Sequence, residues 1–200
     1  MEITTEKKRS RAKVKVPDYL IYEVRKGKPI YYKGYKDVLN KTKTFEEIKM
    51  DSTLQAWLKT RLTIFLGNFL IANGYELTSG EQGFNLSKTD KRGADLAIFK
   101  ADKIVIDEHY SNVPAEITIE IDVSADTEDT TEMDYVLEKV TDYHSFGVQK
   151  VIWIFTKNKK VMVAPVGQPW LTLDWSVDVE VVEGLVINLA DIAAKKKSKN

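Results

Sequence analysis

The sequence predicts an α/β fold in which a mixed β-sheet is flanked by helices. Apolar residues recur at helical spacing over residues 54–70, which indicates one long helix that faces a core. Further on, an alternating strand, a helix and an apolar strand follow one another between Glu116 and Phe155. Two strands joined by a crossover helix form a βαβ unit with parallel strands. The other strand signals are short and hairpin-like, so the sheet should be mixed.

Length and composition set the expected number of domains. The chain has 200 residues, of which 43% are hydrophobic. A chain of this size buries roughly 70% of its unfolded surface, which is enough for one core. We therefore expect a single domain over residues 16–192, between basic tails at residues 1–15 and 193–200.

The residue types that are missing exclude several classes of chemistry. The sequence has no cysteine, which removes disulfides, thiolate zinc sites and cysteine nucleophiles. The two histidines, His109 and His144, leave little room for an imidazole metal site. No window approaches the ~20 apolar residues of a membrane-spanning helix, and the N-terminus lacks an apolar signal region. We expect a cytoplasmic protein whose hydrolytic chemistry, if any, rests on carboxylates and lysine.

The charge balance argues against a broadly basic nucleic-acid-binding surface. The 30 lysines and arginines equal the 30 aspartates and glutamates in number. Because affinity for a nucleic-acid backbone grows with local Lys and Arg contacts, a DNA-binding surface would have to be a patch. The basic stretches Lys7–Lys15 and Lys195–Lys199 could form one, although such termini also serve as flexible, solubilising tails.

The N-terminal half predicts a hairpin and the long helix. Tyr19–Val24 and Pro29–Tyr32 flank a Gly-containing turn and indicate a β-hairpin, which we expect to be an appendage. Ser52 is a candidate N-cap for the helix, and Asn73-Gly74 is a stop signal. The apolar positions of this helix are Leu54, Trp57, Leu58, Leu62, Phe65, Leu66, Phe69 and Leu70.

Short strands complete the predicted sheet. Tyr75–Leu77, Gly83–Leu86 and Leu96–Phe99 precede the βαβ unit, with a loop at Lys100–Lys103. After that unit, Val161–Ala164 should fold back through a turn to form a C-terminal antiparallel extension.

Residues 116–123 carry the sharpest pattern in the sequence. Four β-branched apolar residues alternate there with polar ones, so Glu120 and Asp122 should share one face of a strand. An ordinary half-exposed strand would show the same alternation. However, a parallel sheet is usually covered on both faces, so two carboxylates on one face indicate a cleft.

The following helix, over Thr127–Ser145, carries Lys139. Its expected buried stripe consists of Met133, Val136, Leu137, Val140 and Tyr143. Lys139 should lie near the edge of that stripe, with its stem packed and its ammonium beyond the rim. A solvated lysine paired with Glu132 or Asp142 is the alternative interpretation.

These residues resemble the PD-(D/E)XK nuclease superfamily. The resemblance rests on Gly93-Ala94-Asp95, on Glu116 to Asp122, and on a pattern of residues further along the chain. Within the superfamily the chain is similar to the Uma-type family of proposed bacterial restriction endonucleases, over roughly Thr44 to Asp191. The downstream pattern comprises Lys139, Tyr143, Gly147-Val148 and Trp153.

The resemblance implies a restriction-endonuclease-like fold and a magnesium-dependent site. Asp95 and Glu120 would be catalytic and would bind Mg²⁺, or Mn²⁺, because Mg²⁺ is typically held by one or two carboxylates and several waters. Asp122 stands where the superfamily has its strand lysine; it would be a further or water-mediated ligand, and Lys139 would supply the catalytic lysine. Additional acidic candidates are Glu47, beside Glu46, and Glu81, although a helix cap is the more usual explanation for the first two and a solvated loop for the third.

The sequence therefore favours a Mg²⁺-dependent endodeoxyribonuclease that uses a metal-activated water. Its partner would be DNA, with a homodimer if both strands are cut. The missing strand lysine and the zero net charge favour a competing function, a catalytically inactive binding or assembly module with the same fold. Nuclease chemistry on RNA or on structured DNA is a third hypothesis, and no sequence specificity can be inferred.

Overall fold

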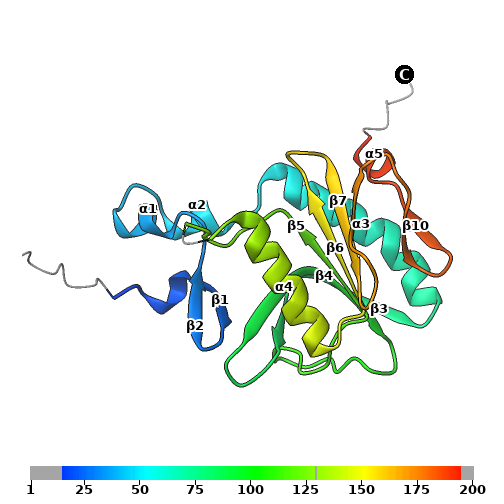
Figure 1. The fold of residues 1–200 in the computed structure, drawn as a ribbon, viewed down its shortest axis with the longest axis horizontal. Coiled ribbons are helices and arrows are strands. Elements are labelled where there is room, and N and C mark those ends of the chain that lie inside the picture. The colour runs from blue at the N-terminus through cyan, green and yellow to red at the C-terminus, as the bar shows by residue number, and fades with distance from the viewer. Residues whose placement is uncertain (1–14, 129, 195–200) are drawn as a thin grey trace, which may run out of the picture.

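A mixed β-sheet with helices on both faces forms the centre of the computed structural model, which describes residues 15–128 and 130–194 (Figure 1). The strand order is β2-β1-β4-β5-β6-β7-β8, and β3 also pairs with β4. The elements are β1 (Ile21–Arg25), β2 (Lys28–Tyr31), α1 (Tyr35–Leu39), α2 (Phe45–Lys49), α3 (Thr53–Ala72), β3 (Tyr75–Asn85), β4 (Lys91–Lys100), β5 (Ile117–Ile121), α4 (Glu132–Phe146), β6 (Lys150–Phe155), β7 (Lys160–Pro165), β8 (Leu171–Asp174), β9 (Val179–Val182), β10 (Leu185–Ile187) and α5 (Leu189–Ala193).

The predicted βαβ unit is present at the centre of the sheet. β5 and β6 are parallel, with Ile119 opposite Ile152, and α4 connects them. All five residues of β5 are buried, because helices cover both of its faces. The predicted C-terminal extension is also confirmed, since β7 returns antiparallel to β6 and β8 pairs with β7.

Two apolar cores lie on opposite faces of the sheet. The first joins α3, α5 and the β9–β10 hairpin to the isoleucines of β5, and the second joins α4 to the other face. Alternation along β5 therefore turns Ile119 toward α3 and Glu120 toward α4. The site described below lies at the end of this strand.

The long helix is confirmed, but its buried stripe is narrower than predicted. Ser52 and Gln55 form a capping box at its start, and Asn73 caps its end. Leu54 and Phe65, predicted to face the core, are 44% and 47% exposed. One row of leucines meets the sheet, namely Leu58, Leu62, Leu66 and Leu70.

The N-terminal hairpin is part of the main sheet, so its prediction as an appendage is wrong. β1 pairs with β2 and, through Val24 opposite Lys91, with β4. Its Glu23 is only 3% exposed. The two short strands predicted at 75–77 and 83–86 form one strand, β3, which is irregular between Ser79 and Gln82.

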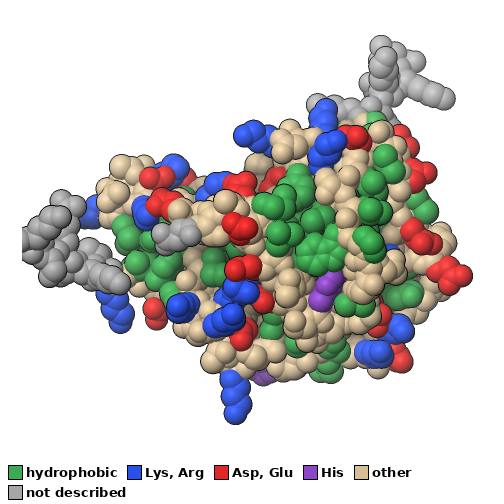
Figure 2. Space-filling view, in the orientation of Figure 1, with side chains coloured by type: hydrophobic (Ala, Val, Ile, Leu, Met, Phe, Trp, Pro, Cys, Tyr) green, Lys and Arg blue, Asp and Glu red, His purple; other side chains and the backbone are tan. Residues whose placement is uncertain are grey.

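Surface charge and helix length complete the general description. On the face seen in Figure 2, lysine and arginine side chains intermingle with aspartates and glutamates. Within the described ranges, no helix has the length and apolar character needed to span a bilayer. The basic stretches Lys7–Lys15 and Lys195–Lys199 lie outside the described residues, except for Lys15.

Candidate active site

Asp95 and Glu120 come together where β4 and β5 separate. The antiparallel register pairs Leu96 with Ile119, and one further step places Asp95 opposite Glu120, on the same face. Oδ2 of Asp95 accepts a hydrogen bond from the Ile121 backbone N–H at 2.7 Å. The two carboxylates that the sequence singled out are therefore neighbours.

Lys139 and Tyr143 of α4 both contact Glu120. The Lys139 ammonium lies 3.1 Å from Oε1 of Glu120. The Tyr143 hydroxyl is 2.7 Å from the same oxygen and 2.6 Å from the Gly93 carbonyl, so its single hydrogen is shared between them. Oε2 of Glu120 accepts no hydrogen bond from the described residues. Among these residues, Thr118 Oγ1 is the one fully buried side-chain N or O atom without a partner, so Oε2 of Glu120 is not completely shielded from solvent. One oxygen of Glu120 thus remains available.

Lys139 is deeper in the protein than predicted, because α4 buries a different face. Met133 and Leu137, expected in the core, are 50% and 40% exposed, whereas Lys139 is 1% exposed. Its ammonium also contacts Glu23 at 2.9 Å and lies 5.6–5.8 Å from the centres of four aromatic rings. These rings belong to Tyr22, Tyr135, Tyr143 and Trp153.

Glu23 and Arg92 extend this buried charge network, and no sequence pattern pointed to either of them. Arg92 donates to Glu23 at 2.6 Å and to Asp142 at 2.6 Å. Glu23 also accepts from the Tyr135 hydroxyl at 2.7 Å and the Gly93 N–H at 3.1 Å. Through Glu23, strand β1 thereby holds the Lys139 ammonium beside Glu120.

The network shifts the acidity of its two glutamates in opposite directions. Burial raises the pKa of Glu120 to about 7, and the charges of Asp95 and Glu23 add to this, although Lys139 and the Tyr143 hydroxyl oppose it. Burial also opposes ionisation of Glu23, but Lys139 and Arg92 outweigh it and lower the Glu23 pKa. Of these two glutamates, Glu120 therefore has the less compensated negative charge.

Lys59 of α3 is a second lysine at the site, and sequence reasoning missed it. Its ammonium lies 2.7 Å from Oδ1 of Asp95 and 2.7 Å from Asp51, and its side chain is 12% exposed. Burial lowers the pKa of Lys59, but these two carboxylates outweigh it and raise the pKa overall. Its position beside the core residue Leu58 was the only hint in the sequence.

Asp122 does not share a face with Glu120, so that prediction is wrong. β5 ends at Ile121, and Asp122 adopts a left-handed backbone with φ of 59°. Its carboxylate accepts from the Thr156 N–H at 2.8 Å, from the Thr156 hydroxyl at 2.7 Å and from the Gln55 amide at 3.4 Å. The turn breaks the strand alternation and directs the Asp122 carboxylate toward Thr156, which follows the end of the neighbouring parallel strand β6.

The remaining candidates lie around or away from this centre. Glu81 lies at the irregularity in β3; partial burial raises its pKa, Lys59 opposes this, and the charge of Asp95 adds to it. Glu47 closes a capping box with Thr44 at the start of α2. His109 lies in a loop, and Nε2 of His144 is 3.1 Å from the Ala164 carbonyl oxygen.

The site offers two neighbouring carboxylates to a cation. In residues 15–128 and 130–194, no three or more His, Asp or Glu side chains converge to hold a metal ion. Mg²⁺ does not require three, since one or two protein carboxylates and several waters usually hold it. Oε2 of Glu120, which accepts no hydrogen bond from the described residues, and the raised pKa of this carboxyl fit such a site.

Comparisons with known proteins agree with this fold. Residues 44–190 match the family model Uma2, described as "Putative restriction endonuclease". A solved structure, described as "a putative nuclease belonging to DUF820 from Anabaena variabilis ATCC 29413", superposes with a TM-score of 0.62 over 85% of this chain and 88% of that chain, at 16% identity. No curated protein matches the chain significantly.

Proposed function

Because this chain belongs to the Uma2 family, we propose that it is a Mg²⁺-dependent endodeoxyribonuclease that hydrolyses phosphodiester bonds with a metal-activated water. The observation that carries the proposal is the pairing of Asp95 and Glu120 at the ends of adjacent strands, each contacted by a different lysine. Mn²⁺ would serve in place of Mg²⁺, since both prefer oxygen ligands.

Asp95 and Glu120 would hold the metal ion. Asp95 is fixed by the Ile121 N–H, and Glu120 is fixed by Tyr143 and Lys139, so neither carboxylate has to be ordered when the ion binds. A bound Mg²⁺ would supply Lewis-acid polarisation of the phosphate and would lower the pKa of a coordinated water.

The two lysines have different roles in this proposal. Lys139 is sealed between Glu23, Glu120 and aromatic rings, so it positions Glu120 and balances its charge. Lys59 retains some exposure and contacts Asp95, so in this proposal its ammonium would face the phosphate and the attacking water. A cation there would stabilise the charge that develops on the phosphate in the transition state.

The substrate would contact the protein through a local surface. The intermingled charges in Figure 2 fit a local contact better than a broad basic face. A double-strand break requires two such centres, so we propose that a homodimer makes it.

The proposal is tested with supercoiled plasmid DNA. The wild type should nick or cut it with Mg²⁺ or Mn²⁺ and stop in EDTA. Asp95→Asn and Glu120→Gln, each folded by circular dichroism, should lower the rate about 100-fold or more. Glu46→Gln, the same change on the exposed α2, should cut like the wild type. Activity that survives both site substitutions would mean that a contaminant cuts the DNA, and inactive wild-type protein that still binds DNA would favour the binding-module hypothesis.

A further inference from the structure

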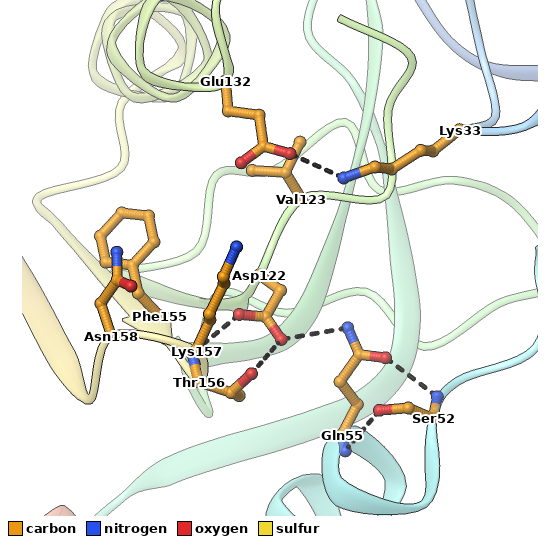
Figure 3. A pocket seen from close by; sticks show the side chains of 10 residues that line it. All are labelled: Lys33, Ser52, Gln55, Asp122, Val123, Glu132, Phe155, Thr156, Lys157 and Asn158. Carbon is orange, nitrogen blue, oxygen red and sulfur yellow. Dashed lines mark hydrogen bonds and ion pairs between the residues drawn. The ribbon is translucent and has the colours of Figure 1, made fainter.

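A polar pocket of about 370 Å³ opens next to the Asp95–Glu120 centre, and the proposed hydrolysis does not use it (Figure 3). Residues close in sequence to those of the centre line this pocket. Asp122 directly follows Ile121, whose N–H holds Asp95, and Gln55 precedes Lys59 by one turn of α3. A DNA strand bound at the Asp95–Glu120 centre would therefore pass the pocket.

The floor of the pocket is already ordered. The Asp122 carboxylate is held by Thr156 and Gln55, while Oε1 of Gln55 accepts from the Ser52 N–H at 2.9 Å. Aspartate tolerates the left-handed backbone better than most residues, which allows the chain to turn away from β5 here. The volume lies at the lower end of the ~300–1,000 Å³ range of small-ligand sites.

The uncommitted groups of the pocket lie at its rim. Lys157 and Asn158, in the β6–β7 turn, line it without a hydrogen bond or ion pair to any described residue, and Figure 3 shows the Lys157 ammonium standing clear of the floor. Phe155 adds an aromatic ring to the lining. Across the opening, Lys33 pairs with Glu132 at 2.6 Å, with both side chains more than half exposed.

This combination matches the chemistry of a nucleotide. A free ammonium binds a phosphate oxygen, an aromatic ring packs against a base or sugar, and a side-chain amide can donate and accept at a base edge. We propose that the pocket binds one nucleotide of the substrate strand beside the scissile phosphate, with Lys157 on a phosphate and Phe155 against the base. This inference rests on the proposed nuclease function.

The test compares two lysines of the same turn. Lys157→Gln and Lys159→Gln each remove one charge, but Lys159 lines a different, apolar hollow near Trp57 and Trp175. Binding of a labelled single-stranded DNA oligonucleotide to the full chain is followed by fluorescence anisotropy in EDTA, where no cleavage occurs. Lys157→Gln should raise Kd about tenfold and lower the salt slope of log K by about one. Lys159→Gln should leave both unchanged.

Other outcomes overturn the proposal in distinct ways. If both substitutions weaken DNA binding equally, the effect comes from the positive charge of the turn as a whole and not from a contact made by Lys157. If Lys157→Gln binds DNA with wild-type affinity, Lys157 does not contact a phosphate. Wild-type protein that does not bind the oligonucleotide would also overturn it. As a second readout, Phe155→Leu should raise KM for cleavage with little change in kcat.

The two hypotheses can fail separately. If DNA binding depends on Lys157 but no plasmid is cut, the nuclease function fails and the nucleotide pocket stands. If plasmid is cut and Lys157→Gln changes neither Kd nor KM, the pocket fails alone.

Discussion

The ammonium of Lys139 lies 3.1 Å from Oε1 of Glu120 while the lysine is only 1% exposed. A buried charge pair that loses one partner leaves the other uncompensated, which typically costs about 3–5 kcal/mol. Lys139→Met should therefore destabilise the fold by about this amount, because Glu23 and Glu120 would both lose their shared cation. Urea unfolding at pH 7 measures the change.

Arg92 keeps Glu23 partly neutralised in that variant, so adding Glu120→Gln should recover part of the lost stability. If Lys139→Met unfolds at the wild-type urea concentration, the ion pairs of Lys139 do not contribute to stability, and its positioning role has no support.

Lys59 should contribute to the cleavage rate but not to metal binding. Lys59→Met removes the cation beside Asp95 and should lower the cleavage rate about 100-fold, since transition-state charge would lose a stabilising group. Lys59→Arg should retain part of the rate. Mn²⁺ affinity of Lys59→Met should not fall, because removing a positive charge favours a cation at Asp95. If Lys59→Met cleaves DNA at the wild-type rate, Lys59 is not the group that stabilises the transition-state charge.

The raised pKa of Glu120 predicts a specific pH dependence of stability. In the folded state this pKa is about 7, against an ordinary value of 4.5. Between these values the folded protein keeps a proton that the unfolded chain releases, so this contribution is full below pH 4.5 and is lost as pH rises through 7. In the variant Glu120→Gln the glutamine does not titrate, and the lowered pKa of Glu23 affects the wild type and the variant alike.

The stability of Glu120→Gln relative to the wild type should therefore rise from pH 4.5 to pH 8, without added metal. Urea unfolding at several pH values gives this difference directly. A difference that stays constant, or that falls with pH, would contradict the raised pKa.

Local signals predicted much of the fold. The apolar run of β6, the alternation of β5 and the caps of α3 each depend on residues close in sequence, and these elements were placed to within a few residues. The same alternation predicted that Glu120 lies on the face of β5 opposite its isoleucines, which in the structure is the α4 side. Asp95 was assigned by resemblance, and the register then put it opposite Glu120.

Long-range charge pairing could not be predicted in the same way. Lys139 is buried because Glu23 arrives from the distant β1 strand, whereas helical periodicity treats a lysine as a surface residue. Lys59 meets Asp95 only once α3 is docked on the sheet. The left-handed turn at Asp122 depends on Thr156 of the neighbouring β6 end, and no alternation pattern contains it.

Asp122 should therefore behave as a pocket residue rather than as a metal ligand. Asp122→Ala removes the acceptor for two Thr156 groups and for the Gln55 amide, which should cost about 1–3 kcal/mol. Asp122→Asn keeps one acceptor oxygen and should cost less. Thermal unfolding of the two variants without metal gives the comparison, and equal Tm values for Asp122→Ala and the wild type would contradict it.

Direct titration with Mn²⁺ tests the central claim, that Asp95 and Glu120 together form one metal centre. Calorimetry should find one site per chain in the wild type, and metal at a hundred times its Kd should add about 2.7 kcal/mol of stability. Asp95→Asn and Glu120→Gln should each abolish the site, while Asp122→Asn should keep it. Binding that is the same in all four proteins, or that is lost only in Asp122→Asn, would contradict the account.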